Sequence, residues 1–340
     1  MAGLRINGDE PLLNRDFLLI TDELRKRGMI FHELISNIYH MTPEIADGIL
    51  AQGHAPEIYV SFDGLGHHDW LRGIPGAERR TLENIAMLKS KGFFVHVHYC
   101  VWRASLDAIR PTILRLRELG VDRLRITTIE PSVRWVADAP EQSLDPKEWL
   151  EYLCGLLPWW YENRVDMSLD VWSYWKNDRG SRRVSIVPDM HRDCEREDRI
   201  AACPDGYKMP IIDCDGRIML CLGLSGITKA LGIDWGNAYT DDLHALLTDG
   251  PFIRQCLCTV GKMKKQNPEC SRCEWAGHCR FGCRAEALDQ GSGIDGIDRR
   301  MCVFFREGFY RRFLDIAARY GLRDGQGGSP QAVPGAGKHI

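Results

Sequence analysis

The stretch "MLKSKGFFVHVHYC", residues 87–100, contains the pattern that decides the fold. Before Gly92 it is the charged end of an amphipathic helix, in which apolar residues recur at helical spacing. After Gly92 it becomes a β-rich run. Gly92 falls at the helix C′ position, where a positive φ costs glycine little. The stretch therefore predicts a helix that ends at a glycine and is followed directly by a β-strand.

The same helix–glycine–strand pattern occurs in "ELRKRGMIFHELIS", residues 23–36, and in "RLRELGVDRLRITTI", residues 115–129. Gly28 and Gly120 take the position of Gly92. Strands that alternate with helices of about a dozen residues indicate βαβ units and a parallel sheet. We expect five strands before residue 130 and a sixth after it, at about 3–7, 29–36, 57–63, 93–101, 123–129 and 164–175.

Polar residues follow the predicted strands at their carboxyl ends, where parallel sheets carry their functional loops. One such group alone is typical of a turn or a helix cap. Five together predict a functional rim, formed by "NGDEP" (7–11), "SN" (36–37), "SFDG" (61–64), "YCVW" (99–102) and "TIEP" (128–131).

Composition limits the class of protein. The chain has 340 residues, of which 44% are hydrophobic and 27% charged, as in ordinary soluble domains. The net charge of −3 does not show the excess of positive charge that is typical of nucleic-acid-binding proteins. No apolar run reaches the roughly 18 residues of a membrane span, and the N-terminus does not resemble a secretory signal. We expect a cytoplasmic protein without nucleic-acid or membrane partners.

The thirteen cysteines are unevenly distributed, with none before Cys100 and eleven between Cys194 and Cys302. In a reducing compartment an odd, clustered set favours metal binding or catalysis over disulfides. The distribution predicts two domains and a tail. We place them at 1–190, at 191–308, and at 309–340 for the end of a C-terminal helix, predicted over 303–321, and a disordered tail.

Four of these cysteines lie in "CSRCEWAGHCRFGC", residues 270–283, with the spacing C-x2-C-x5-C-x3-C. Four thiolates on one short segment repel each other unless a cation binds them, either zinc or an iron–sulfur cluster. Zinc ribbons favour two knuckles separated by a longer spacer, and here only the first pair forms a knuckle. The spacing alone leaves zinc and iron–sulfur open.

The wider cysteine pattern resembles a known signature. Cys203, Gly216 and Cys221 form C-x12-G-x4-C, and Cys302 follows the four-cysteine block. Together these closely resemble the seven-cysteine signature of the SPASM domain, the C-terminal extension of many radical SAM enzymes. The segment "GNAYTDDLHALL", residues 236–247, is similar to the one that those domains carry between the two blocks.

The N-terminal part resembles the catalytic barrel of the same enzymes. "NGDEPLL", residues 7–13, is similar to the motif that holds the amino group of S-adenosylmethionine (SAM), and "SFDGLGHHDWLRGIPG", residues 61–76, to a stretch after the fourth barrel strand. The resemblance covers residues 3–308. It implies an α/β fold: a partial (β/α)6 radical SAM barrel followed by a small cysteine-rich SPASM domain.

The sequence departs from the family at one point. Radical SAM enzymes hold their reactive cluster with C-x3-C-x2-C after the first strand, and this sequence contains no such motif. We therefore expect the first βα unit to be absent, either by truncation or in a chain that has lost the chemistry and only binds. We favour truncation, because a barrel that begins at its second strand exposes an unpaired edge.

The resemblance implies two auxiliary [4Fe–4S] clusters. The ligands of one would be Cys270, Cys273, Cys279 and Cys302, and those of the other Cys203, Cys221 and Cys283. For the fourth ligand of the second cluster, Cys214, Cys194, a substrate thiolate and an open site all remain. Cys258 is interpreted as a buried thiol.

The resemblance also implies the SAM site: Gly8, Glu10, Asn37, Ser61, Asp63 and Arg72. Gly8 and Glu10 would hold the amino group, with Asp9 in place of the usual second glycine. Ser61 and Asp63 would reach the ribose. Arg72 would bind the SAM carboxylate or form a surface ion pair. His98 and Tyr99 would lie near the substrate or pack in the core.

Radical SAM enzymes cleave SAM to a 5′-deoxyadenosyl radical that abstracts hydrogen, and SPASM members act mostly on peptides and proteins. The resemblance thus implies a peptide or protein substrate, a reductant such as flavodoxin or ferredoxin, and a separate leader-peptide-binding protein as a candidate partner. Sulfatase-maturating members carry Asp directly after the G-x4-C cysteine, where this chain has Leu222. Ribosomal peptide maturation is therefore favoured.

Two alternatives remain: a non-catalytic zinc or iron–sulfur protein for binding or electron transfer, and a degenerate barrel that only binds peptide. The metal that the chain binds would distinguish the first alternative from the radical SAM enzyme and from the degenerate barrel. Because the C-x3-C-x2-C motif is absent, we expect this chain alone to leave SAM uncleaved.

Overall fold

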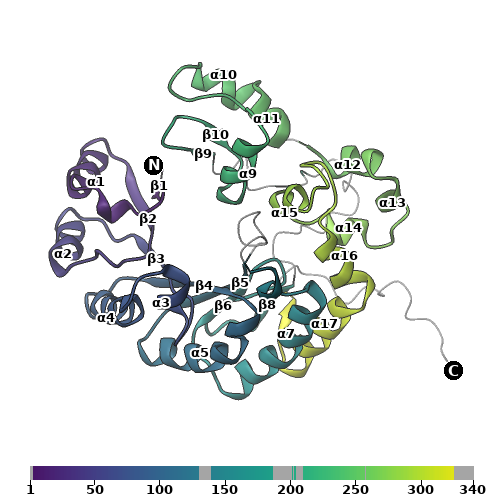
Figure 1. Ribbon diagram of the computed structural model, residues 1–340, viewed down its shortest axis with the longest axis horizontal. Helices are drawn as coiled ribbons and strands as arrows, with labels where there is room; N and C mark the ends of the chain where they lie inside the picture. Colours follow the sequence, from purple (N-terminus) through teal and green to yellow (C-terminus); the bar gives the residue numbers. More distant parts are fainter. Residues whose placement is uncertain are drawn as a thin grey trace. The chain divides into compact units, whose positions relative to one another are not determined.

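The structure, a computed structural model, describes residues 3–129, 139–186, 201, 203, 210–256 and 258–324 (Figure 1). Its contacts divide the chain into two compact units. The sheet unit comprises residues 1–144 and 155–184, and the cysteine unit comprises residues 145–154 and 185–340. The predicted domain bounds at 190 and 308 stay a prediction.

The sheet unit is built on six parallel strands that pair in chain order. They are β1 (Gly3–Ile6), β2 (Ile30–Ser36), β3 (Glu57–Ser61), β4 (Val95–Val101), β5 (Arg123–Thr128) and β6 (Ser168–Val171). β7 (Trp175–Asn177) pairs antiparallel with β6, and β8 (Arg183–Ile186) follows it. The six predicted strands and the α/β class are confirmed.

Helices separate the parallel strands. They are α1 (Phe17–Lys26), α2 (Pro43–Ala51), α3 (His68–Arg72), α4 (Ala77–Ser90), α5 (Ile109–Glu118) and α7 (Pro146–Glu162), with short turns η1 (Pro11–Leu13), η2 (Arg103–Ala108) and η3 (Pro140–Gln142). Gly28, Gly92 and Gly120 follow three of these helices with φ values of 69°, 83° and 74°, as predicted.

The two faces of this sheet differ in character. Alternate residues of a strand point to opposite faces, so one set of side chains is apolar and fully buried: Ile58, Val60, Val95, Val97, Leu124, Ile126 and Val171. The other set, here called the inner face, is polar: Tyr59, Ser61, His96, His98, Arg125 and Asp170. The register places Tyr59 beside His96, and His98 between Ser61 and Arg125. Helices α1, α2, α4 and α5 line the outer side of the curved sheet (Figure 1), so the apolar set forms the core beneath them.

The cysteine unit consists mostly of short elements. A hairpin of β9 (Ile211–Ile212) and β10 (Ile218–Met219) precedes η5 (Leu222–Leu224). The helices are α9 (Ser225–Ala230), α10 (Leu243–Thr248), α11 (Pro251–Cys256), α12 (Val260–Gln266), α13 (Pro268–Ser271), α14 (Ala276–Cys279), α15 (Arg284–Asp289), α16 (Arg299–Arg306) and α17 (Phe309–Arg319), and β11 (Arg323–Asp324) ends the described chain. Among all helices of the described residues, none has the length and apolar composition of a membrane span.

The single helix predicted over 303–321 is wrong. The structure has two helices, α16 and α17, which are separated at Gly308. Gly308 has a φ of 87°, a left-handed conformation that ends one helix and caps the next. The predicted disordered tail lies outside the described residues.

Gly64, directly after the "SFD" run, packs closely against Tyr99 of strand β4. It has a φ of 96°, and a Cβ there would come 2.8 Å from Tyr99 Cζ. Gly73 has a φ of 66° with open space around it. We expect Gly73→Ala to lower the free energy of unfolding by about 1–2 kcal/mol, from backbone strain. Gly64→Ala should lower it by about 1–3 kcal/mol more, because the ring of Tyr99 must move.

Denaturant unfolding of both variants measures the difference. Equal losses for the two alanine variants would show that Tyr99 does not pack against Gly64.

Candidate functional site

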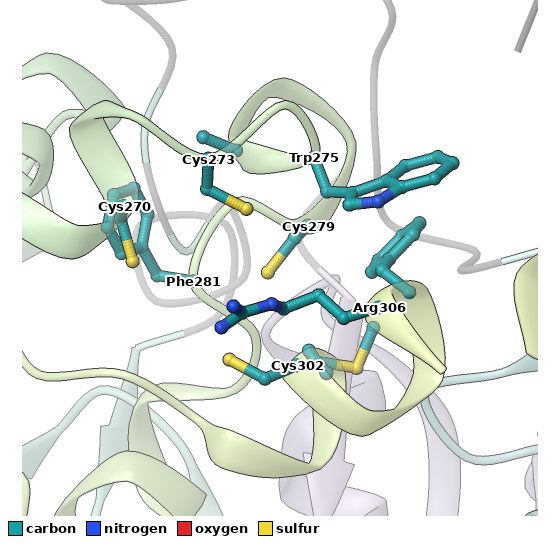
Figure 2. A pocket seen from close by; sticks show the side chains of 10 residues that line it. Cys270, Cys273, Trp275, Cys279, Phe281, Cys302 and Arg306 are labelled. Atoms are coloured by element: carbon teal, nitrogen blue, oxygen red, sulfur yellow. The ribbon is translucent and has the colours of Figure 1, made fainter. Parts of the chain in front are cut away.

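The clearest candidate site is a cavity in the cysteine unit, lined by Cys270, Cys273, Cys279 and Cys302 (Figure 2). These are the four cysteines that the resemblance assigns to one cluster. They come from α13, the turn after it, α14 and α16. The structure therefore brings this predicted ligand set together, and its role as a ligand set stays a prediction.

Local backbone turns place the first three of these cysteines. The amide of Cys273 donates to the carbonyl of Cys270 at 3.1 Å, and the amide of Cys279 to that of Trp275 at 2.8 Å. The carboxylate of Asp298 caps α16 by accepting from the amide of Arg300 at 3.1 Å. Cys302 follows within the first turns of that helix.

The rest of the cavity wall is mostly apolar. Trp275, Phe281, Met301 and Phe305 line it, each no more than 5% exposed. The rings of Trp275 and Phe305 stack with centroids 5.4 Å apart. This wall keeps water away from the thiols, which is the environment that an iron–sulfur cluster requires.

Burial favours the protonated form of Cys270, Cys279 and Cys302 in the absence of a cation. Burial, with a smaller contribution from the nearby thiol of Cys302, raises the pKa of Cys270 to about 11. Burial also raises the pKa values of Cys279 and Cys302. A bound cation would reverse this shift, because a coordinated thiol loses its proton. The pocket is therefore stable either as neutral thiols or as thiolates around positive metal.

The donor set and the space around it fit a cluster. A single zinc would draw four sulfur atoms to about 2.3 Å from one centre. In the described part of the chain, no three His, Cys, Asp or Glu side chains lie close enough to hold one metal ion. The four thiols instead line one cavity from different sides. Four soft thiolate donors around such a space suit an iron–sulfur cluster.

The second predicted set is placed only in part. Cys221 and Cys283 pack against the same apolar cluster of the cysteine unit. Burial is the main cause that raises the pKa of Cys283 to about 12, and the nearby thiol of Cys221 contributes to the rise. Cys203 is partly buried, and Cys214 is exposed in the β9–β10 turn. Cys194 lies outside the described residues.

A strained turn separates the two sets. Arg280, Phe281 and Gly282, between Cys279 and Cys283, have φ values of 45°, 67° and 70°. Such conformations cost non-glycine residues about 1–2 kcal/mol each and persist only where the surroundings impose them. The buried guanidinium of Arg284 imposes this turn by donating to the carbonyls of Phe281 and Gly282.

In the sheet unit, Glu10 joins the ends of β1 and β2. Its carboxylate accepts from the hydroxyl of Ser36 at 2.7 Å, the amide of Asn37 at 2.8 Å and the amide of Leu12 at 3.0 Å. The predicted SAM residues Glu10 and Asn37 therefore lie in contact. Gly8, two residues earlier, has a φ of 139° and open space where a Cβ would be.

Asp63 and Arg72 are engaged with each other. The guanidinium of Arg72 donates to the carboxylate of Asp63 at 2.7 and 3.2 Å, and His68 Nδ1 lies 3.0 Å from it. Asp63 is fully buried. Arg72 thus forms an ion pair, although with a buried acid. The contributions of Ser61, Asp63 and Arg72 to SAM binding stay predictions.

The inner face carries two neutral histidines. The rings of His96 and His98 lie 4.8 Å apart, with Tyr59 4.3 Å from His96. Burial lowers the pKa of His98 to about 3 and that of His96 strongly. Within the described chain, neither nitrogen of His96 nor Nε2 of His98 has a hydrogen-bond partner. Tyr99 is fully buried on the opposite face, which agrees with core packing.

Sequence reasoning missed three residues here: His68, Trp275 and Arg306. His68 follows the "SFDG" run by four residues and Trp275 lies inside the cysteine stretch. Arg306 lies four residues after Cys302, one helical turn along, and lines the same cavity. Helical spacing from a predicted ligand would have identified it.

Comparison with known proteins gives sequence relatives of one kind. No family model matches the chain. An AdoMet-dependent heme synthase of Methanosarcina barkeri is 25% identical over 296 residues, 84% of this chain and 77% of that protein. One of Nitratidesulfovibrio vulgaris is 23% identical over 275 residues, 78% of this chain and 69% of that protein.

Solved structures share the fold. The enzyme anSMEcpe with bound AdoMet and the Kp18Cys peptide has a TM-score of 0.64 at 14% identity, over 94% of this chain and 85% of that one. SuiB of Streptococcus suis with bound S-adenosylmethionine has a TM-score of 0.62 at 14% identity, over 88% of this chain and 66% of that one. The α/β fold, with its mostly parallel sheet, is therefore similar to that of radical SAM enzymes.

The buried histidines predict a pH dependence of stability. Burial, followed by the charges of Arg125 and Arg5, lowers the pKa of His98 from 6.5 to about 3. Between these values the unfolded chain binds a proton that the folded chain does not. The free energy of unfolding should therefore decrease as the pH falls from about 6.5 towards 3, by up to about 1.4 kcal/mol per pH unit for this group.

We expect His98→Gln to reduce this slope, and replacement of the exposed His244 to leave it unchanged. Urea unfolding between pH 5 and 7 measures it. A His98→Gln slope equal to that of the wild type would show that His98 is protonated in the folded chain.

Proposed function

We propose that this chain belongs to a radical SAM/SPASM type of enzyme that modifies a peptide or protein, with two auxiliary [4Fe–4S] clusters and S-adenosylmethionine as cofactors. The observation that carries the proposal is the cavity lined by Cys270, Cys273, Cys279 and Cys302. The likeness to radical SAM enzymes in sequence and in fold supports it. Cys203, Cys221 and Cys283 are the proposed ligands of the second cluster, with Cys214 a candidate for its fourth.

The chain's own residues would contribute in distinct ways. Clusters of this kind supply one-electron transfer when bound. The four thiols would hold one such group, and the Trp275–Phe305 wall would exclude water from it. The Glu10 carboxylate, which the end of β2 fixes in place, would accept the amino group of SAM. The neutral imidazole of His98 would offer a hydrogen bond to substrate on the inner face.

A peptide substrate is supported by two of the structures that share the fold. One is anSMEcpe with a bound peptide, and another is SuiB with its precursor peptide SuiA. We propose the same class of substrate here, with ribosomal peptide maturation as the reaction class. A flavodoxin or ferredoxin would be the reductant, and a separate leader-binding protein remains a candidate partner.

A second candidate is chemistry on a haem precursor. It is favoured by the sequence relatives, which are AdoMet-dependent heme synthases. The two substrates can be told apart by binding, because iron porphyrins have visible absorption bands that shift when an imidazole binds the iron. A shift that His98→Gln abolishes would favour the haem precursor over the peptide.

Metal content is the first test of the proposal. We expect about eight irons and eight sulfides per chain after anaerobic reconstitution, four for each cluster. Cys279→Ala should remove about four irons, since it deletes one ligand of the four-thiol cavity. Cys100→Ala, which changes a thiol of the sheet unit, should remove none.

One or two zinc ions per chain with no iron would instead support the non-catalytic alternative and overturn the radical SAM proposal.

The chain as given should also fail to cleave SAM. With dithionite as reductant we expect no 5′-deoxyadenosine, because the sequence contains no C-x3-C-x2-C motif. Chromatography of the reaction mixture measures the product. If 5′-deoxyadenosine formed at a rate proportional to the protein concentration, another set of cysteines would have to bind the reactive cluster.

A further inference from the structure

Arg306 is distinguished by where its charge lies. Ten residues line the four-thiol cavity: four cysteines, five apolar residues and Arg306 (Figure 2). Figure 2 shows the guanidinium of Arg306 extending among the sulfur atoms of Cys270, Cys279 and Cys302. Arg306 is therefore the one basic side chain in the wall of this cavity.

Glu269 lies near enough for the charge of Arg306 to lower the pKa of its carboxyl, but it pairs with another arginine. Within the described residues, Arg306 has no carboxylate within ion-pair distance. Arg299, on the same helix, differs in this respect. Its guanidinium pairs with both carboxylate oxygens of Glu269, at 2.7 and 3.0 Å. Glu269 thus offsets the charge of Arg299, which also interacts with the thiol of Cys302, whereas no carboxylate of the described residues pairs directly with Arg306.

A single cation in a wall of thiols and apolar side chains suits an anion in the cavity. An iron–sulfur cluster held by four thiolates has a net negative charge, and it becomes more negative when it takes up an electron. Hydrogen bonds to the sulfurs and nearby charge set the reduction potential of such clusters. A guanidinium beside the sulfurs favours the reduced form, since the attraction grows with the negative charge.

We propose that Arg306 is a positioning residue for electron transfer, which raises the reduction potential of the cluster held by Cys270, Cys273, Cys279 and Cys302. This inference rests on the proposed function, because it requires that cluster. Beyond the four ligands, one side chain would then make this cluster easier to reduce. Arg306 does so by its charge and its N–H donors, and not by binding metal.

The test uses the full chain, reconstituted anaerobically, with the variants Arg306→Gln and Arg306→Lys. The matched control is the double variant Arg79→Gln/Glu83→Gln, which removes an exposed ion pair of α4 in the sheet unit and leaves the net charge unchanged. Iron and sulfide are measured per chain. Midpoint potentials are then measured by titration with dithionite, followed by electron paramagnetic resonance.

We expect Arg306→Gln to keep its iron and to lower one midpoint potential by about 59 mV, a tenfold change in the equilibrium constant for one electron. Arg306→Lys should shift it by less than half as much, because the charge remains. The control should shift it little. If Arg306→Gln loads no cluster while Arg306→Lys does, the charge is needed for assembly, which also supports the inference.

Three outcomes would overturn it. One is an iron-loaded Arg306→Gln whose potentials equal those of the wild type. Another is a Lys variant that shifts as far as the Gln variant, and the third is failure of both variants to load although both fold by circular dichroism. A wild-type chain without iron would be a separate result, because it would overturn the proposed function itself.

Discussion

The mutual repulsion of buried thiolates is the constraint on which the cysteine unit depends. Four sulfurs around one cavity with an apolar wall can ionise together only if positive charge enters the cavity. Without it, burial favours the protonated form of Cys270, Cys279 and Cys302, whose pKa values it raises. Metal bound by these thiols would therefore also contribute to the folding of this unit.

The sequence was sufficient for features with a local cause. The strands and their preceding glycines follow from periodicity and from helix ends, so β1 to β6 lie where they were predicted. The grouping of four cysteines followed from spacing together with family resemblance. The break at Gly308 was missed because the apolar pattern continues across it, and only the left-handed backbone shows it.

Features with a tertiary cause could not be predicted in the same way. Asp63 was expected to reach the ribose, and Arg72 to bind the SAM carboxylate or form a surface ion pair. The structure pairs these two residues with each other and places His68 beside them, which the sequence spacing does not show. Alternation along β4 left His98 and Tyr99 open between substrate and core. The register decided it, because it places His98 beside Arg125 on the polar inner face and leaves Tyr99 on the apolar one.

Two arginines near the cysteines, Arg284 and Arg306, differ in how firmly the protein holds them. Arg284 is 4% exposed and donates to four carbonyls, so it is fixed, and its main effect is to hold the strained turn between Cys279 and Cys283. Arg306 reaches the cavity from an exposed position on α16 and is not held by such bonds within the described residues. Its guanidinium can therefore adjust to the charge in the cavity, which is what a residue that responds to electron transfer requires.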